Sequence, residues 1–385
     1  MSHKTTIGVG MVGYAFMGRV HSQAWRSVGA FFDLPLAPRM AALAGRSKER
    51  TEAAAAQLGW DAVETDWREL IKRDDVQIVD ICTPGDSHAE IAIAALAAGK
   101  HVICEKPLAN TVAEAEAMVR AAAAAPASVK SMVAFNYRRV PAVALARRFV
   151  EEGRLGEIRH VRAQYLQDWI VDPEFPLVWR LQKDKAGAGA LGDIGSHIVD
   201  AAEFVSGQHI VGVSGLMETF IKERPLAGES AGLGASRTDA MGEVTVDDAA
   251  LFFGRMSGGA LASFEATRFA TGRKNAMRIE INGQLGSLAF DFEAMNELWF
   301  SSGGGGFERI LVTEPDHPYV GAWWPPGHGL GYEHTFTHEI KDFLEAIATG
   351  ADPSPSFADG LRVQRILEAV ERSAADGSRY TNVED

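Results

Sequence analysis

The chain has 385 residues, of which 46% are hydrophobic and 23% charged, and its formal net charge is −13. This length favours two domains, or one domain with a large extension, and leaves enough material for a sizeable core. The negative charge argues against nucleic acid or an anionic membrane as partner. Two cysteines, Cys82 and Cys104, cannot form a disulfide framework. No stretch reaches the roughly 20 apolar residues of a membrane span, and we expect no secretory leader, because residues 1–6 contain no apolar region followed by a cleavage site. We expect a cytoplasmic protein.

The first predicted elements form a dinucleotide site. An apolar strand at 7–12 leads through a glycine turn into a helix at 19–28, which is the layout of such sites. Gly13, Ala15 and Gly18 take the three fingerprint positions, with Ala15 in place of the middle glycine. A second G-x-G-x-x-G match at 8–13 lies inside the strand, so we assign the turn to 13–18. A glycine turn that holds no ligand is the alternative.

The second predicted strand, 40–44, bears on the choice of cofactor. NAD sites usually carry an acidic residue at this strand end for the ribose hydroxyls, but here the chain continues with Gly45, Arg46 and Ser47. Arg46 could bind a 2′-phosphate and Ser47 could donate a hydrogen bond to it. This pattern favours NADP over NAD. In the alternative, Ser47 caps the helix 48–58 and Arg46 is solvated.

Further strands at 76–82, 101–104 and 131–135 alternate with helices, which predicts a doubly wound parallel sheet. The strand 101–104 delivers Lys106 to its carboxyl end, the edge at which open α/β sheets bind ligands. There Lys106 could hold a substrate oxygen. The alternative is an ordinary solvated lysine.

After the helix 141–152 the pattern changes to strands without long helices between them. They lie at 158–167, 212–220, 249–255, 260–266, 278–282, 287–291 and 298–301. This succession predicts an α+β domain with an open, mainly antiparallel sheet. The segment 225–242 reads as a long loop, 303–306 as a hairpin tip, and 333–349 and 357–373 as helices.

Two stretches of this second domain could carry chemistry. Asp193 and His197 lie four residues apart at the start of a predicted helix, so they share one face, and the carboxylate could set the tautomer of the imidazole. The alternative is a helix-end Asp and an ordinary His. Aromatic and polar residues at 165–169 and 179–180 suit a sugar ring, although packing in the core explains them equally well.

Three histidines near the last helices, His328, His334 and His338, invite interpretation as a zinc site. No glutamate lies between His334 and His338 as the H-E-x-x-H motif requires, so we expect no metal. Tyr332 beside them is a better candidate for a substrate contact.

Four motifs occur together along nearly the whole chain: Gly13-x-Ala15-x-x-Gly18, Thr83-Pro84 before His88, Gly99-Lys100-His101-Val102 running into Glu105-Lys106-Pro107-Leu108, and Asp193-Ile194-Gly195-Ser196-His197. With them the chain resembles the Gfo/Idh/MocA oxidoreductases, named after glucose–fructose oxidoreductase and inositol dehydrogenase. The stretches 136–138, 165–169 and 265–268 look most like the branch that includes levoglucosan dehydrogenase.

This resemblance implies a Rossmann domain over 1–137 and a substrate-binding and oligomerisation domain over 138–385. It also implies a homodimer or homotetramer built through the sheet of the second domain. Two departures, Ala15 for a glycine and Gly45-Arg46 for the acidic residue, bear on which nicotinamide cofactor, NAD or NADP, is preferred.

By the same resemblance Lys106, Asp193 and His197 form the catalytic group. His197 would accept the proton of a substrate hydroxyl and Lys106 would donate to its oxygen, while Asp193 would anchor His197 or Lys106. We place the cofactor contacts at Gly13, Ala15, Phe16, Met17, Gly18, Arg46, Ser47, Thr83, Pro84, His88, Glu105, Lys106, Trp179 and Arg180. We place the substrate contacts at Lys106, Asn136, Tyr137, Gln167, Asp193, His197 and Tyr332.

The sequence therefore predicts an NAD(P)-dependent dehydrogenase of a sugar, anhydrosugar or cyclitol. One alternative is a hydrolase of the same fold that keeps NAD bound and cleaves glycosidic bonds through transient oxidation. Another is a dinucleotide sensor without catalysis.

Overall fold

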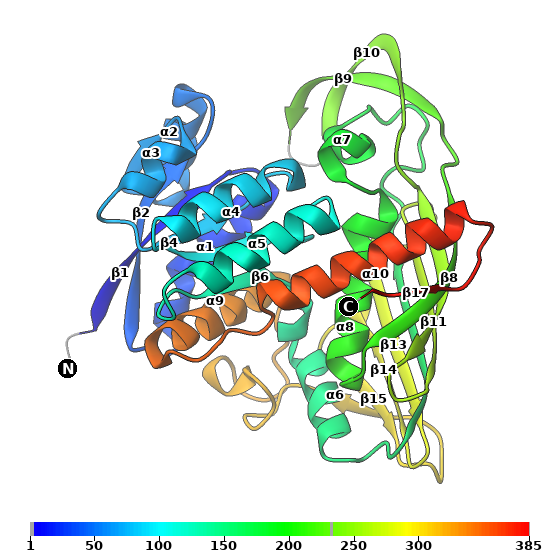
Figure 1. The fold of residues 1–385 in the computed structure, drawn as a ribbon. Helices are drawn as coiled ribbons and strands as arrows, with labels where there is room; N and C mark the ends of the chain where they lie inside the picture. Colours follow the sequence, from blue (N-terminus) through cyan, green and yellow to red (C-terminus); the bar gives the residue numbers. More distant parts are fainter. Residues whose placement is uncertain (1–3, 232–233, 385) are drawn as a thin grey trace. The chain divides into compact units, whose positions relative to one another are not determined.

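The computed structural model describes residues 4–231 and 234–384, whose contacts separate into two compact units (Figure 1). Unit 1 comprises Met1–Asn136 and Tyr332–Leu361, and unit 2 comprises Tyr137–Gly331 and Arg362–Asp385. The sequence placed both C-terminal helices in the second domain. The contacts instead group the helix α9 (Tyr332–Thr349) with unit 1, because its apolar face packs against the helix α1 (Phe16–Phe31) of that unit.

Unit 1 is built on a parallel sheet of six strands in the order β3-β2-β1-β4-β5-β6. The strands are β1 (Thr5–Val12), β2 (Leu36–Ala44), β3 (Ala62–Glu64), β4 (Ile78–Ile81), β5 (His101–Glu105) and β6 (Ser131–Ala134). Continuous apolar runs form these strands because helices cover both faces of a parallel sheet. The strand order reverses between β1 and β4, and ligands of doubly wound sheets bind at such a switch point. The predicted Rossmann class is thereby confirmed.

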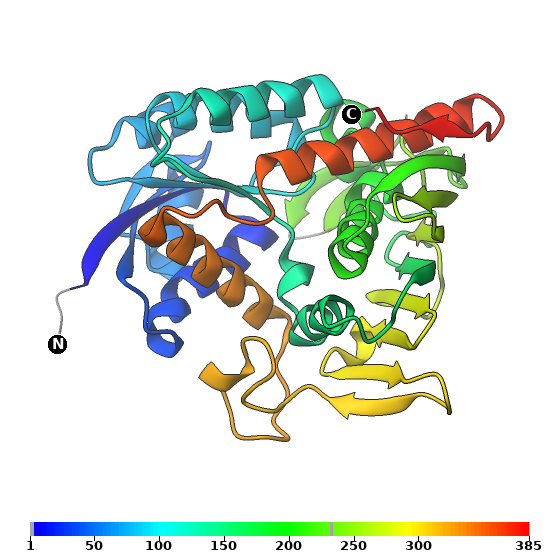
Figure 2. The same ribbon diagram turned by 60° about the horizontal axis from the view of Figure 1, so that its bottom comes forward.

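The other helices of unit 1 are α2 (Lys48–Leu58), α3 (Trp67–Lys72), α4 (His88–Ala97) and α5 (Val112–Ala124). Their ends follow from local chemistry: Ser47 caps α2, and Thr111 with Glu114 forms a reciprocal capping box on α5. Figure 2 shows α5 and α9 on opposite faces of the sheet. Unit 1 is therefore a sheet between two helical layers.

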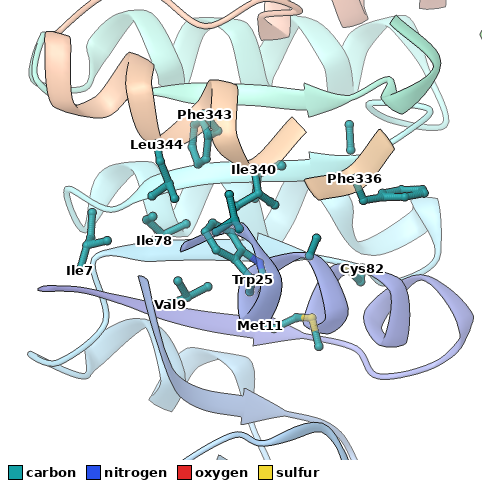
Figure 3. Packing of buried hydrophobic residues seen from close by; sticks show 14 of the residues in the cluster. Ile7, Val9, Met11, Trp25, Ile78, Cys82, Phe336, Ile340, Phe343 and Leu344 are labelled. Carbon is teal, nitrogen blue, oxygen red and sulfur yellow. The ribbon is translucent and has the colours of Figure 1, made fainter. Parts of the chain in front are cut away.

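The core on the α9 side of this sheet joins residues from distant parts of the sequence (Figure 3). Side chains of β1 and α1 meet the apolar stripe of α9, among them Ile7, Val9, Met11, Trp25, Phe336, Ile340, Phe343 and Leu344. Trp25, Ile340 and Phe343 are each at most 2% exposed. The stripe on α9 therefore supplies part of the first unit's own core.

Unit 2 holds a sheet of nine strands in the order β16-β15-β14-β13-β7-β12-β11-β8-β17. Only β7 and β12 pair in parallel, and every other neighbouring pair is antiparallel. The strands are β7 (Ile158–Leu166), β8 (Ile210–Glu218), β11 (Ala249–Met256), β12 (Leu261–Thr267), β13 (Ala276–Gly283), β14 (Ser287–Asp291), β15 (Glu297–Ser301), β16 (Glu308–Leu311) and β17 (Thr381–Asn382). The predicted open, mainly antiparallel sheet is confirmed.

Helices cover one face of this sheet, and the described residues leave side chains on the other face exposed. The helices α6 (Pro141–Glu151) and α8 (Ser196–Ser206) pack on the covered face. Burial alternates along the strands: in β11, Phe252 and Gly254 are buried whereas Leu251 and Phe253 are exposed. This period of two is the pattern expected of a sheet with one face in the core.

The segment 225–242, predicted as a loop, is instead largely a two-stranded antiparallel ribbon of β9 (Glu223–Ala231) and β10 (Gly234–Glu243). Positions 232–233 of the predicted loop lie outside the described residues. The sequence of this segment shows no alternation of apolar and polar residues, because most described side chains on both faces of the ribbon are exposed. Pairing of the two backbones, which needs no hydrophobic pattern, makes the ribbon.

The helix α10 (Phe357–Ala375) runs from unit 1 into unit 2, and the short helix α7 (Lys183–Ala186) lies in unit 2. The four glycines 303–306 form the predicted tip between β15 and β16. Within the described residues, no helix has the length and hydrophobicity that spanning a bilayer would require.

Candidate active site

The glycine turn after β1 has the geometry of a dinucleotide cradle. Gly13 adopts a φ of +96°, and a Cβ built there would lie 2.7 Å from the carbonyl oxygen of Cys82, at the end of the neighbouring strand β4. A Cβ on Gly18 would lie 2.4 Å from the carbonyl oxygen of Gly13. Neither position tolerates a side chain, so the turn can bring its backbone close to a ligand.

The N-terminus of α1 follows directly on this turn. Ala15 is its N-cap and provides no side-chain hydrogen bond, and the first turn carries no acidic residue. The N–H groups of that turn therefore keep their positive partial charge for an anion. A methyl group at Ala15 stands on an exposed position. These features fit a site in which the turn 13–18 binds the pyrophosphate of a nicotinamide dinucleotide.

At the end of β2 the ring of Tyr14 occupies the space beside Gly45, where a Cβ would lie 2.1 Å from a ring carbon. Arg46 is exposed, and Ser47 accepts the amide hydrogen of Arg50 as the N-cap of α2. No carboxylate stands at this strand end. The predicted capping role of Ser47 is confirmed, and its role toward a cofactor phosphate stays a prediction.

The ends of β4 and β5 are tied together by His88. Its ring nitrogens lie 2.8 Å from the carbonyl oxygen of Thr83 and 3.0 Å from that of Pro107, and the side chain is 1% exposed. His88 thus fixes the loops that carry Thr83 and Lys106. Lys106 itself is half-buried.

Asp193 and His197 lie where a π-helical turn, Leu191–Gly195, passes into α8. Such turns occur frequently at functional sites. His197 is 7% exposed, and its ring centroid lies 4.5 Å from that of Tyr137 and 5.9 Å from that of Tyr165. The sequence predicted a regular helix through Asp193, and local spacing gave no sign of the wider turn.

A polar network borders the two tyrosines. The hydroxyl groups of Tyr137 and Tyr165 lie 2.5 Å apart, and Tyr165 donates to Oδ1 of Asn275 at 2.6 Å. Gln167 donates to the same oxygen at 2.8 Å and accepts the indole hydrogen of Trp169 at 3.0 Å. Aromatic faces beside amide and hydroxyl groups suit a polyhydroxylated ring. Sequence reasoning missed Asn275, a lone loop residue without a motif.

Two buried arginines, Arg268 and Arg138, contact the segments that carry Asp193, His197 and Tyr137. Arg268, fully buried, lies 3.8 Å from Oδ2 of Asp193 through Nη1 and donates to the carbonyl oxygen of Asp247 at 3.0 Å. Arg138 forms a buried pair with Asp200, both carboxylate oxygens accepting from its Nε. This pair links the turn that carries Tyr137 to α8.

The remaining predicted contacts fall in both units. In unit 1, Phe16 stacks on Tyr332 with ring centroids 6.5 Å apart, and Asn136 donates to the hydroxyl of Thr335 at 2.9 Å. Met17 packs on the core beside α9. In unit 2, Trp179 and Arg180 form the short helix η3 (Trp179–Leu181), with the guanidinium 4.3 Å from the Trp179 ring centroid.

The three histidines considered for zinc do not gather among the described residues. His338 is buried with its ring against Phe32, and His334 lies 3.5 Å from Glu333. The one group of potential ligand atoms found in the described chain is instead His21, Asp80 and Cys82.

A Rossmann unit with a glycine cradle, followed by a unit with a one-sided sheet and an Asp–His turn, defines the class of nicotinamide-dependent oxidoreductases. Comparison with known sequences makes the assignment specific. Residues 7–134 match the oxidoreductase family with an NAD-binding Rossmann fold, and residues 143–289 match the GFO/IDH/MocA C-terminal domain. The chain belongs to this Gfo/Idh/MocA family.

Three relatives are similar over nearly their whole length. Levoglucosan dehydrogenase of Pseudarthrobacter phenanthrenivorans is 45% identical over 97% of this chain and 97% of its own. The crystal structure of an oxidoreductase domain protein from Kribbella flavida is 63% identical, with a TM-score of 0.94 over 99% of this chain and all of that one. A levoglucosan dehydrogenase in complex with NADH and levoglucosan is 43% identical, with a TM-score of 0.93 over 99% of this chain and 100% of that one.

Proposed function

We propose that this protein transfers hydride between a nicotinamide cofactor and a hydroxyl-bearing carbon of a sugar, anhydrosugar or cyclitol. The observation that carries the proposal is the Asp193–His197 turn with its wall of tyrosine and amide groups, in a chain whose first unit contains the dinucleotide cradle. The relative that binds levoglucosan with NADH supports the substrate class.

In the proposed mechanism, Gly13, Ala15 and Gly18 would hold the pyrophosphate of a nicotinamide dinucleotide, which would supply the acceptor for the hydride that the substrate carbon loses. His197 accepts the proton of the substrate hydroxyl as general base. Lys106 donates a hydrogen bond to the same oxygen and favours its developing negative charge. Asp193, with Arg268 at its side, orients the polar groups around this proton transfer.

A screen of sugars, anhydrosugars and polyols, each with NAD and with NADP, tests the proposal through the absorbance of the reduced cofactor. We expect substrate-dependent reduction with at least one anhydrosugar or cyclic polyol. Release of a sugar from a glycoside without net reduction would instead identify the hydrolase. Cofactor binding without turnover of any compound in the screen would identify a sensor.

The preference for NADP remains a prediction, since the relative in complex with NADH does not support it. Arg46 is exposed at the end of β2, where a 2′-phosphate would lie. We expect Arg46→Ala to lower the ratio of kcat/KM with NADP to kcat/KM with NAD about tenfold, since one exposed charge-assisted hydrogen bond is lost. Steady-state kinetics with both cofactors measures this ratio.

The control for that experiment is Arg120→Ala, which removes another exposed arginine, in α5. It should leave the cofactor ratio unchanged. A ratio that is also unchanged in Arg46→Ala, or NAD used far better than NADP by the unaltered protein, would refute the preference.

We also propose that the open face of the unit 2 sheet pairs with a second copy of the chain. Leu216, Leu251, Phe253 and Leu261 are between 49% and 71% exposed on β8, β11 and β12. Residues of β7, β8 and β11–β15 line a depression of about 700 Å³ on the same sheet. Exposed apolar side chains gathered on one face are typical of an interaction surface.

Replacing Phe253 by Glu is expected to shift the protein toward monomers, because the charge would have to be buried in the apolar interface. Sedimentation analysis at several concentrations measures the change. Leu285→Glu is the matched control, since Leu285 is 55% exposed in the turn between β13 and β14. An unaltered protein that is monomeric at micromolar concentration would contradict the proposal.

We infer a reducing compartment, the cytoplasm, from the two thiols. Cys82 and Cys104 are both free and buried, and burial raises the pKa of each thiol well above its usual value. Such cysteines behave as small core residues rather than as partners for disulfide formation.

A further inference from the structure

A buried charged cluster lies in unit 1 beneath the strand end that carries Lys106. His21 of α1, fully buried, has its Nδ1 3.0 Å from both carboxylate oxygens of Asp80 on β4. Its Nε2 lies 2.9 Å from Oε1 of Glu105 at the end of β5. One imidazole thus bridges two carboxylates from neighbouring strands.

A carboxylate oxygen faces each ring nitrogen of His21, and an imidazolium with a proton on both nitrogens satisfies both contacts. Burial is the largest single influence and lowers the pKa of His21, but the charges and hydrogen bonds of Asp80 and Cys82 together outweigh it, so that the pKa lies well above its usual value. Asp80 also accepts hydrogen bonds from the indole of Trp25 at 2.7 Å and from the thiol of Cys82 at 3.4 Å. The cluster therefore holds an imidazolium between carboxylates whose other acceptor positions are largely filled.

The cluster is connected to Lys106 by the backbone. The second carboxylate oxygen of Glu105, Oε2, accepts the amide hydrogen of Lys106 at 3.1 Å. His21 lies one turn beyond Gly18, on the helix that starts at the dinucleotide cradle. A continuous path of hydrogen bonds therefore runs from α1 through His21 and Glu105 to the backbone of Lys106.

We propose that His21 is a positioning residue that fixes Glu105, and through it the backbone at Lys106, relative to the helix of the cofactor cradle. The inference rests on the proposed role of Lys106 in the reaction. The surroundings of the ring explain why a histidine is needed. Ionisable groups of β4 and β5 and of the residue after β4 lie around it, namely Asp80, Cys82, Cys104 and Glu105, and Phe336 of α9 packs with its ring centroid 5.4 Å away. Without the imidazolium, two buried carboxylates would face each other unpaired.

Two substitutions separate positioning from simple packing. The amide of His21→Asn can take the place of Nδ1 and keep the bond to Asp80, but it cannot reach Glu105. The longer amide of His21→Gln can take the place of Nε2 and keep the bond to Glu105. We expect His21→Asn to lower kcat about 10²-fold, the effect of a small misplacement at a reacting group, with the Kd of the cofactor within about threefold of the unaltered protein. His21→Gln should retain at least ten times more activity than His21→Asn.

Trp25→Phe is the control, because it removes a hydrogen bond to Asp80 without touching Glu105. It should lower stability and leave kcat within about twofold. Equal losses of kcat in His21→Asn, His21→Gln and Trp25→Phe would show a purely structural role and overturn the inference.

A second readout needs no substrate. Reductive methylation with ¹³C-formaldehyde labels the lysines, and the resonance missing from Lys106→Arg identifies Lys106 in the NMR spectrum. We expect this resonance to shift in His21→Asn and to stay in place in Trp25→Phe. If the Lys106 resonance does not move in His21→Asn, the inference is overturned, whether or not the screen finds a substrate. Failure of the inference can therefore be told apart from failure of the proposed function.

The metal content of the purified protein is a further test. One equivalent of a transition metal, removable by a chelator, would overturn the inference in favour of a metal site at His21, Asp80 and Cys82.

Discussion

Replacing His197 by Asn, or Lys106 by Met, should lower kcat about 10²–10⁴-fold, the usual contribution of one acid–base group. The cofactor should still bind, because the cradle at Gly13 and Gly18 owes its shape to the backbone and to neither of the two substituted side chains. Steady-state turnover with the best substrate of the screen and a fluorescence titration with reduced cofactor measure the two quantities. In His197→Asn the acid limb of the pH profile of kcat/KM should also disappear, since the general base has gone.

The matched control is His209→Asn. His209 lies in unit 2 as well, but its side chain is 60% exposed and pairs with Glu203 outside the tyrosine group. Its substitution should leave kcat and cofactor affinity unchanged. Turnover close to that of the unaltered protein in His197→Asn or in Lys106→Met would remove that residue from the proposed mechanism.

The largest loss of stability is expected from Asp200→Ala. The side chains of Arg138 and Asp200 are 9% and 2% exposed, so the substitution removes a carboxylate that is paired with a buried guanidinium. Loss of one partner of a buried pair typically costs about 3–5 kcal/mol. Unfolding in urea, followed by circular dichroism, measures the change in the free energy of unfolding.

The double variant Arg138→Met/Asp200→Leu should recover much of that loss, because apolar groups of similar volume replace the whole pair. Glu69→Ala is the control for an exposed pair: it breaks the contact with Lys72 on α3, where both side chains are more than half exposed, and should change stability by less than about 1 kcal/mol. If Asp200→Ala cost no more than this control, the pair would not stabilise the fold.

The elements of unit 1 could be predicted closely because each carries a local signal. The helix α2 begins at its Ser47 cap and ends before Gly59, which takes a left-handed conformation, and both bounds agree with the prediction. The strand ends that carry Thr83 and Lys106 were predicted because apolar runs stop there abruptly. Candidate site residues at such strand ends can therefore be predicted without knowing which distant residues contact each other.

What could not be predicted depends on contacts between residues far apart in the sequence. Nothing local marks His21 as the partner of Asp80 and Glu105, which follow 59 and 84 residues later. Asn275 meets Tyr165 across 110 residues through a single hydrogen bond, which leaves no pattern. The ribbon of β9 and β10 was taken for a loop because exposed small residues in paired strands look like irregular chain.

The place of α9 in the first core has a consequence for biosynthesis. The strands of the Rossmann sheet leave the ribosome early, but Phe336, Ile340, Phe343 and Leu344 emerge only after every strand of the second sheet except β17. At about 5–20 residues per second, the roughly 200 residues in between take on the order of 10–40 s to translate. During this time Ile7, Val9 and Trp25 lack their contacts with α9, so the core of the first unit is completed only after most of the second unit has been translated.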